Sequence, residues 1–234
     1  MISTRHPFMA VTKPFGIDLN DPNLVLYLPL WSLKLSGSPF VSLDLNHHSF
    51  DVIGAIQSSE GRYFDAVDDK ITHTASGWRS SDSSGTIIVW VKSTATAYLF
   101  TSSDEAVPTK HLAFAIHPDK GGYLIQVNGD TECQVVGNAD IADNTWHMAA
   151  VTSSGTAWSI FHDNVQDTPE VLAGTNNGDW FADTSNRDNV VVGAIVKSSE
   201  SHLEVNIGEV WVYSRALSAV EIRNIYYKTK GRYL

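Results

Sequence analysis

The chain has 234 residues, of which 43% are hydrophobic and 18% are charged. This composition indicates a globular protein with a well-filled core rather than a disordered chain. The formal net charge is −10, from 26 acidic and 16 basic side chains. An acidic surface repels phosphate, and no run of Lys and Arg with interleaved aromatic residues offsets it, so we expect no nucleic-acid partner. No segment approaches the ~18 consecutive apolar residues of a transmembrane helix, so we also expect no membrane insertion.

The N-terminal residues contain Pro7, Pro14 and Pro22 and show no sustained hydrophobic periodicity. They predict an extended arm over residues 1–22, followed by a single domain over residues 23–234. An arm without a core of its own becomes ordered by lying on another surface. That surface is either the flank of the domain itself or a neighbouring protein subunit of an assembly. The arm also lacks the apolar stretch of a signal peptide. If the chain is a complete gene product, we expect it outside the cell or on a virion surface, and we expect it to arrive there without a signal peptide.

Short strand-like runs alternate with turn signals from residue 24 onward. The runs cover residues 24–30, 85–93, 111–118, 123–136, 145–171, 189–197 and 202–217. Asn128–Gly129 predicts a hairpin, because both residue types tolerate positive φ. Ser218 followed by Glu221 is a capping box, which predicts one short C-terminal helix. Many short strands with regular turns predict an all-β fold, an antiparallel β-sandwich.

Four segments of the chain match patterns of one known family. Residues 61–73, GRYFDAVDDKITH, match the signature FDGVDDYI, and residues 207–226, IGEVWVYSRALSAVEIRNIY, match the ending IDEVRIYNRALSAEEI. Residues 144–164 match a W-H-H-V-A … Y-V-D-G meander, and residues 24–31, LVLYLPLW, fit an opening strand. Together they resemble the laminin G-like family of concanavalin A-like jelly rolls over residues 24–226. The resemblance implies two antiparallel sheets, often a structural calcium ion, and glycan or protein binding at one face or rim. It does not imply catalysis.

A group of acidic residues is the candidate metal site. Asp65, Asp68 and Asp69 surround a tight turn, and Glu209 approaches them if the fold is as inferred. Calcium takes six to eight oxygen ligands, which these carboxylates and nearby carbonyls could supply. Alternatively, the aspartates accept hydrogen bonds from the N–H groups of the turn. Gly208 replaces an acidic residue of the family and removes one oxygen ligand, so one structural calcium ion and a capped turn both remain open.

The segment 204–209, EVNIGE, resembles the E-x-D-x-x-E motif of jelly-roll glucanases. Such enzymes need two carboxylates about 5 Å apart, and a bulge at Gly208 would bring Glu204 and Glu209 to one face. However, Asn206 replaces the central acid, and the laminin G-like ending explains the whole segment. We therefore expect no enzyme, and a jelly-roll glycoside hydrolase is the least favoured alternative.

Aromatic residues in loops are the candidate ligand-binding site, because flat rings stack on the apolar faces of sugars and neighbouring amides bind the hydroxyls. Two loops, over residues 77–85 and 174–189, combine such groups. The predicted ligand-binding residues are Trp78, Arg79, Asn176, Asn177, Asp179, Trp180 and Phe181. Alternatively, the loop tryptophans close the end of the sandwich as core residues.

The sequence favours a non-catalytic binding or adhesion protein over an enzyme. The preferred hypothesis is an external structural component of a larger assembly, such as a bacteriophage decoration or fibre protein, that also binds a glycan or another host-surface ligand. The alternative is a stand-alone carbohydrate-binding module of a cell-surface or secreted protein. The arm separates the two hypotheses, because only an assembly component needs it.

Overall fold

A computed structural model describes residues 18–74 and 76–234 and contains two large antiparallel sheets. One sheet has eight strands in the order β14-β13-β12-β7-β19-β5-β4, and β1 also pairs with β19. Its strands are β1 (Leu24–Pro29), β4 (Ile56–Gln57), β5 (Arg62–Asp65), β7 (Gly85–Lys92), β12 (His147–Ser153), β13 (Trp158–His162), β14 (Val165–Gln166) and β19 (Glu204–Tyr213).

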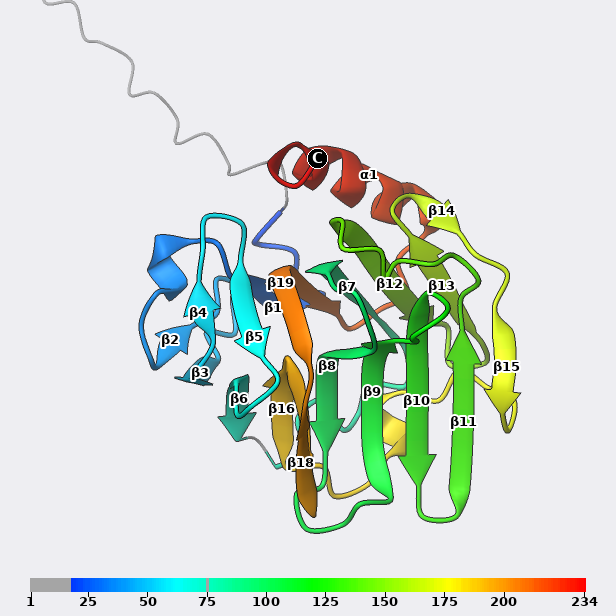
Figure 1. The fold of residues 1–234 in the computed structure, drawn as a ribbon. Helices are drawn as coiled ribbons and strands as arrows, with labels where there is room; N and C mark the ends of the chain where they lie inside the picture. Colours follow the sequence, from blue (N-terminus) through cyan, green and yellow to red (C-terminus); the bar gives the residue numbers. More distant parts are fainter. Residues whose placement is uncertain (1–17, 75) are drawn as a thin grey trace, which may run out of the picture.

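The other sheet has nine strands in the order β15-β11-β10-β9-β8-β16-β6-β3-β2. Its strands are β2 (Phe40–Val41), β3 (Ser49–Ile53), β6 (Lys70–Thr74), β8 (Ala97–Ser103), β9 (Lys110–Ile116), β10 (Gly122–Asn128), β11 (Thr131–Val136), β15 (Glu170–Ala173) and β16 (Asn189–Val192). Strands β8 to β11 run side by side across the face turned to the viewer in Figure 1. The predicted all-β sandwich is confirmed.

The main core lies between the two sheets and follows the alternation of the strands. In β7, Ile87, Val89 and Val91 belong to this core, whereas Ile88 and Trp90 point to the other face of the sheet. Period-two alternation places successive side chains on opposite faces. Both faces of β7 are nevertheless buried, so a further layer must cover the outer face of the eight-stranded sheet.

That layer is the C-terminal helix α1 (Ala219–Thr229). The predicted capping box is present: the Ser218 side chain accepts from the backbone N–H of Glu221, and the Glu221 carboxylate accepts from the N–H of Ser218 at 2.8 Å. Ile222 and Ile225 of the helix pack into a second apolar cluster on the sheet. Within residues 18–74 and 76–234, the short helical turns are η2 (Leu33–Leu35), η3 (Phe181–Asp183) and η4 (Lys230–Arg232).

A small hairpin, β17 (Ala194–Lys197) with β18 (Ser199–His202), covers part of the outer face of the nine-stranded sheet. The sequence predicted one strand over residues 189–197, but Gly193, with φ +85°, divides it into β16 and β17. A Cβ at Gly193 would lie 2.3 Å from the Phe64 ring, so the chain turns where only glycine fits. The Thr101 hydroxyl of β8 then donates to the carbonyl of Ala194 at 2.9 Å, which fixes the hairpin on the sheet.

Two other sequence predictions need adjustment. The β10–β11 hairpin forms, but Asn128 pairs with Thr131, so the turn consists of Gly129 and Asp130 rather than Asn128–Gly129. Of the predicted arm, residues 1–17 lie outside the described residues. Residues 18–22 are described, and Leu19 packs against the apolar cluster under α1, so the last part of the predicted arm contacts the domain. Within the described ranges no helix has the length and apolarity to cross a membrane.

Candidate functional site

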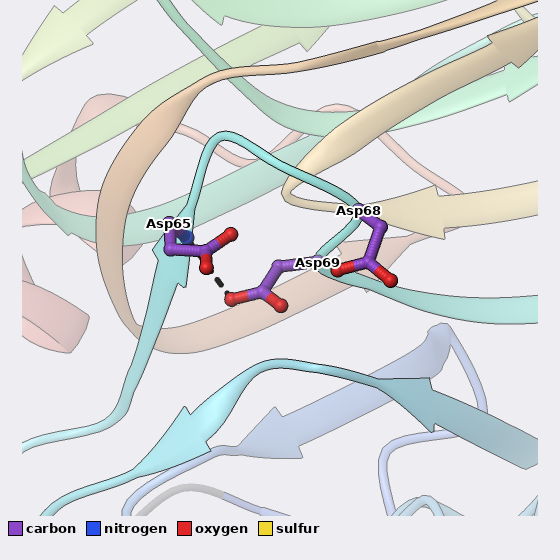
Figure 2. A group of neighbouring side chains, drawn as sticks. All are labelled: Asp65, Asp68 and Asp69. Carbon is purple, nitrogen blue, oxygen red and sulfur yellow. Dashed lines mark hydrogen bonds between the residues drawn. The ribbon is translucent and has the colours of Figure 1, made fainter.

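Three of the four predicted metal ligands meet at the turn between β5 and β6 (Figure 2). Carboxylate oxygens of Asp65, Asp68 and Asp69 all lie within 4.8 Å of one another. The backbone N–H of Asp65 donates to Asp69 Oδ2 at 3.0 Å, so the capping interaction expected as the alternative is also present. Burial raises the pKa of Asp69, and the neighbouring carboxylates of Asp65 and Asp68 raise it further, against the lowering effect of the Asp65 N–H.

The turn fits a hard divalent cation. Three carboxylates of like charge side by side repel one another, and a calcium ion relieves this repulsion through oxygen ligands. Gly54, with φ +67°, approaches so closely that a Cβ there would lie 1.6 Å from Asp69 Oδ1. A larger residue would therefore fill the space beside the carboxylate. Asp65, Asp68 and Asp69 are the residues that would hold the ion, and the ion would tie β5 to β6.

Glu209 does not belong to this group, so that part of the predicted metal site is wrong. Asp65 pairs with Glu204 on β19, and Glu209 lies five residues further along the strand, about 16 Å away. Among the described residues, the carboxylate cluster contains the three aspartates alone. The family resemblance gave no information on which end of β19 meets the turn, and this depends on strand register.

Glu209 is instead buried in the layer between the eight-stranded sheet and the C-terminal segment, where it is 1% exposed. Its carboxylate accepts hydrogen bonds from Trp31 Nε1 at 2.9 Å and from the hydroxyls of Tyr27 and Tyr233 at 3.1 Å. Arg232 Nε lies 3.6 Å from the same carboxylate. Burial raises the pKa of Glu209, while Arg232 and the three hydrogen bonds oppose this shift.

The glucanase-like motif does not form an open active site. The register shifts between Ile207 and Glu209, as the sequence suggested for Gly208. The ring of Tyr233 covers this bulge, because a Cβ on Gly208 would lie 2.5 Å from it. Of the two glutamates, Glu204 is exposed and Glu209 is enclosed, so the pair does not face a common space that could hold a substrate.

The aromatic residues of the 174–189 loop are core residues. Trp180 is 0% exposed and Phe181 is 1% exposed, so neither ring offers a face to a sugar and the predicted aromatic platform is absent. Both belong to the main core, where they close one end of the sandwich. This is the alternative that the sequence left open, and burial of large apolar area is the physical reason for it.

The polar residues of the same loop hold it in place. Asn176 accepts from the backbone N–H of Trp158 at 2.6 Å and donates to its carbonyl at 3.0 Å, as an additional strand would. Asn177 Nδ2 donates to Asp179 Oδ2 at 2.7 Å. Burial raises the pKa of Asp179, and the Asn177 hydrogen bond opposes this. These amide and carboxylate groups bond one another and the adjacent strand β13, which holds the loop in place.

The second predicted loop is also structural. Trp78 is 7% exposed and packs edge-on against Phe181 at 5.2 Å. The guanidinium of Arg79 forms two hydrogen bonds to Asp82, at 2.5 and 2.9 Å. Arg187, which is 1% exposed, joins the two loops by donating to the carbonyls of Trp78 and Phe181.

The outer face of the nine-stranded sheet carries two partly exposed tyrosines that the sequence did not identify. In β9 and β10, the large side chains Phe114 and Leu124 point into the core. Ala115 and Tyr123 alternate with them and point outward, and they are paired in register. Tyr98 of β8 also pairs with Ala115. Both tyrosines are half-buried, so part of each ring is accessible.

Polar groups surround Tyr123 on this face. Its hydroxyl donates to Gln134 Oε1, and Gln134 Nε2 donates to Glu132. The imidazole of His117 meets the tyrosine ring edge-on, with 5.5 Å between centroids. Burial raises the pKa of Tyr123 to about 12, helped by the Glu132 carboxylate. In the sequence, the alternation of small and large residues in 110–116 indicated which side chains of β9 point outward. It did not indicate that Tyr98 lies beside Ala115, because this depends on strand register.

A sequence profile described as the concanavalin A-like lectin/glucanases superfamily matches residues 57–223. The chain belongs to this superfamily. The match includes the aspartate turn and the strands of the outer face. No curated protein sequence matches the chain.

Solved structures share the fold of this concanavalin A-like domain at low sequence identity. The CBM40 domain of the Ruminococcus gnavus IT-sialidase, bound to α2,6-sialyllactose, is 16% identical with a TM-score of 0.53, over 61% of this chain and 82% of that one. The Trypanosoma rangeli sialidase is 13% identical with a TM-score of 0.63, over 90% of this chain. The binding domain of botulinum neurotoxin DC, in complex with rat synaptotagmin II, is 10% identical with a TM-score of 0.64, over 88% of this chain. The similarity spans 33% of the sialidase and 51% of the toxin chain.

Proposed function

We propose that this protein is a non-catalytic glycan-binding domain whose ligand lies on the outer face of the nine-stranded sheet. The observation that carries this proposal is the accessible ring of Tyr123 with Gln134 beside it. An aromatic ring supplies apolar contact to a pyranose, and a neighbouring amide can exchange hydrogen bonds with its hydroxyls. The loops predicted to do this are closed by their own packing.

We propose that the domain is not catalytic because Glu209 is buried. A retaining or inverting glycosidase needs two carboxylates that flank the scissile bond. Glu209 is covered by Tyr233 and accepts hydrogen bonds from three aromatic side chains. Displacing these groups would leave a buried carboxylate and several donors without partners.

Similar structures give this proposal further support. One is a CBM40 domain bound to sialyllactose, and another is a toxin binding domain in complex with a protein. Both are binding rather than catalytic units by their descriptions. The ligands belong to those proteins, and a shared fold alone does not transfer them.

We further propose that the domain is an external component of a larger assembly, for example of a virion, and that residues 1–17 dock it to neighbouring subunits. These residues combine Pro7 and Pro14 with the apolar Phe8 and Phe15, and they adjoin Leu19, which packs on the domain. A stand-alone carbohydrate-binding module of a secreted or cell-surface protein would need no such segment.

Binding to immobilised neutral and sialylated oligosaccharides tests the glycan proposal. We expect Tyr123→Ala to lower the affinity for any bound glycan by about tenfold, roughly the loss of 1.4 kcal/mol. Tyr123→Phe should retain most of the affinity, because the ring remains. Tyr227→Ala is the matched control, since Tyr227 is an exposed tyrosine on α1. Equal affinity of Tyr123→Ala and wild type would contradict the proposed location.

We also propose one structural calcium ion at the aspartate turn. Calcium should raise the melting temperature of the wild type, because a ligand that binds only the folded state stabilises it. Asp69→Asn should abolish this increase, since Asp69 is the buried member of the cluster. Asp51→Asn, on the neighbouring strand β3 outside the cluster, should keep it. A calcium-independent melting temperature in the wild type would disprove the proposal.

A further inference from the structure

Two surface hollows that share Trp31 form a groove beside β1. The first hollow, of about 240 Å³, is lined by Leu19, Tyr27, Pro29, Trp31, Ser32, Lys34 and Leu43. The second hollow, of about 520 Å³, is lined by Trp31, Leu33, Gln57, Ser58 and Ser59. We call the two hollows together the Trp31 groove.

The Trp31 groove exposes apolar side chains to solvent. Leu33 of η2 is 84% exposed, and Trp31 is half-buried. Arg232 covers one face of the Trp31 ring, with 3.4 Å between the guanidinium carbon and the ring centroid. The side-chain amide of Gln57 donates to two backbone carbonyls of the domain itself. The groove therefore offers mainly apolar contact, and neighbouring exposed apolar side chains are typical of a surface that binds another protein.

The described chain begins at the end of β1 that is opposite to Trp31. Leu19 lines the groove, whereas Asp18, one residue earlier, lines a separate hollow with Tyr213. Tyr213 pairs with Leu24 at the start of β1, and Trp31 follows the end of this strand. A copy's own residues 1–17 would therefore have to turn back along β1 to reach Trp31, while a segment of another copy can approach it directly.

The charge of residues 1–17 is opposite to that of the domain. They contain Arg5 and Lys13 and no acidic residue, so they carry a formal charge of +2. The net charge of the whole chain is −10, so the rest of the chain carries −12. Opposite charges favour the encounter of this segment with the domain of another copy.

The segment is also long enough to reach another copy. Phe8 lies ten residues before Asp18, and ten extended residues span about 33–36 Å. A compact domain of this size has a radius of roughly 22 Å, so Phe8 can pass beyond its own domain. Phe15 lies only three residues before Asp18, which limits its reach to about 10 Å.

From these observations we infer that the Trp31 groove of one copy receives Phe8 of a second copy, and that this contact holds the copies together. The inference rests on the proposed assembly role of residues 1–17 and specifies the surface that binds them. The Phe8 ring supplies apolar area to Trp31 and Leu33. Pro7 restricts the backbone directly before Phe8, which lowers the conformational entropy lost on docking.

Analytical ultracentrifugation of full-length variants tests the inference. The wild type should self-associate, and Phe8→Ala and Leu33→Asp should each weaken the association by about tenfold or more. Val165→Asp is the matched control for the groove, because Val165 is 64% exposed but lies on β14, at the opposite edge of the eight-stranded sheet from β4. Phe15→Ala is the matched control for the segment. Both controls should associate as the wild type does.

Mixing two of these variants distinguishes docking between copies from docking within one copy. Phe8→Ala keeps an intact groove, and Leu33→Asp keeps an intact N-terminal segment. An equimolar mixture should therefore form one-to-one complexes, although each variant alone is mainly monomeric. Adding Phe8→Ala to the Leu33→Asp chain should abolish these complexes, since neither partner then carries Phe8.

The outcomes separate the inference from the proposed assembly role. If the wild type associates and Leu33→Asp or Phe8→Ala associates equally well, the groove is not the docking surface, but the assembly role stands. If the mixture forms no complex, docking between copies through this groove is wrong. A wild type that stays monomeric would overturn self-assembly together with the inference, and would leave glycan binding unaffected. Circular dichroism and melting temperatures check that each variant is folded.

Discussion

The carboxylate of Glu209 is surrounded by donors from two separate parts of the chain, the region of β1 and the C-terminal segment. Trp31 follows β1, Tyr27 lies on β1, and Tyr233 ends the C-terminal segment. Buried charges are tolerated only when they are paired and hydrogen-bonded, and this one satisfies that condition. A residue that resembled a catalytic acid in sequence is therefore a connection between the sheet and the C-terminal segment.

Replacing Glu209 should destabilise the domain to a degree that depends on the substituent. Glu209→Ala leaves Tyr27, Trp31 and Tyr233 without their acceptor, and we expect a loss of about 3–5 kcal/mol in the free energy of unfolding. Glu209→Gln keeps the shape and an acceptor oxygen, and should cost less than about 2 kcal/mol. Urea denaturation at pH 7 measures both values.

The pH dependence of stability distinguishes the two variants from the wild type. Burial raises the pKa of Glu209 above that of the unfolded chain, so the folded state holds this proton more tightly. The group therefore favours folding below its unfolded pKa and loses that contribution as the pH rises through its raised folded pKa. Glu209→Gln should lack this fall in stability. An unchanged pH profile in Glu209→Gln would mean that Glu209 titrates as an ordinary carboxyl group.

Among the structural elements, those defined by local chemistry were predictable from the sequence. The capping box at Ser218 and Glu221 predicted the start of α1, and Asn128–Gly129 predicted the β10–β11 hairpin, although its turn lies one residue further along. Strand-like runs between turn signals predicted most long strands, although β8 (Ala97–Ser103) was not among them. These features depend on residues close in sequence, so no knowledge of the sheet order was required.

The candidate site was less predictable because it depends on register. Tyr98 and Tyr123 belong to different strands and share a row only through their common partner Ala115. The 174–189 loop has the composition of a binding loop, yet Trp180 is enclosed by the core. Composition states which groups a loop carries, whereas exposure depends on how the loop packs against the end of the sandwich. Glu209 was wrongly assigned to the aspartate turn for a related reason: its distance from that turn depends on the register between β19 and β5.

For the whole molecule, the proposed role of residues 1–17 in assembly can be separated from the stability of the described domain. The sandwich has its own core and a second cluster under α1, so it should fold without residues 1–17. We expect deletion of these residues to change the melting temperature by less than about 3 °C while reducing a larger assembly to monomers, because residues 18–234 already supply both apolar clusters. Analytical ultracentrifugation of both versions measures this. A monomer in both cases would contradict a role in self-assembly, and unfolding of the shortened chain would make the segment part of the domain.

The central claim is that this domain binds a glycan without transforming it. The most direct measurement combines calorimetric titration of a neutral oligosaccharide with mass spectrometry of the sugar recovered afterwards. The account predicts saturable binding that Tyr123→Ala weakens by about tenfold, and an oligosaccharide recovered at its original length. Shortened products that disappear in Glu204→Gln would contradict it, because they would assign glycosidase chemistry to a strand that we consider structural.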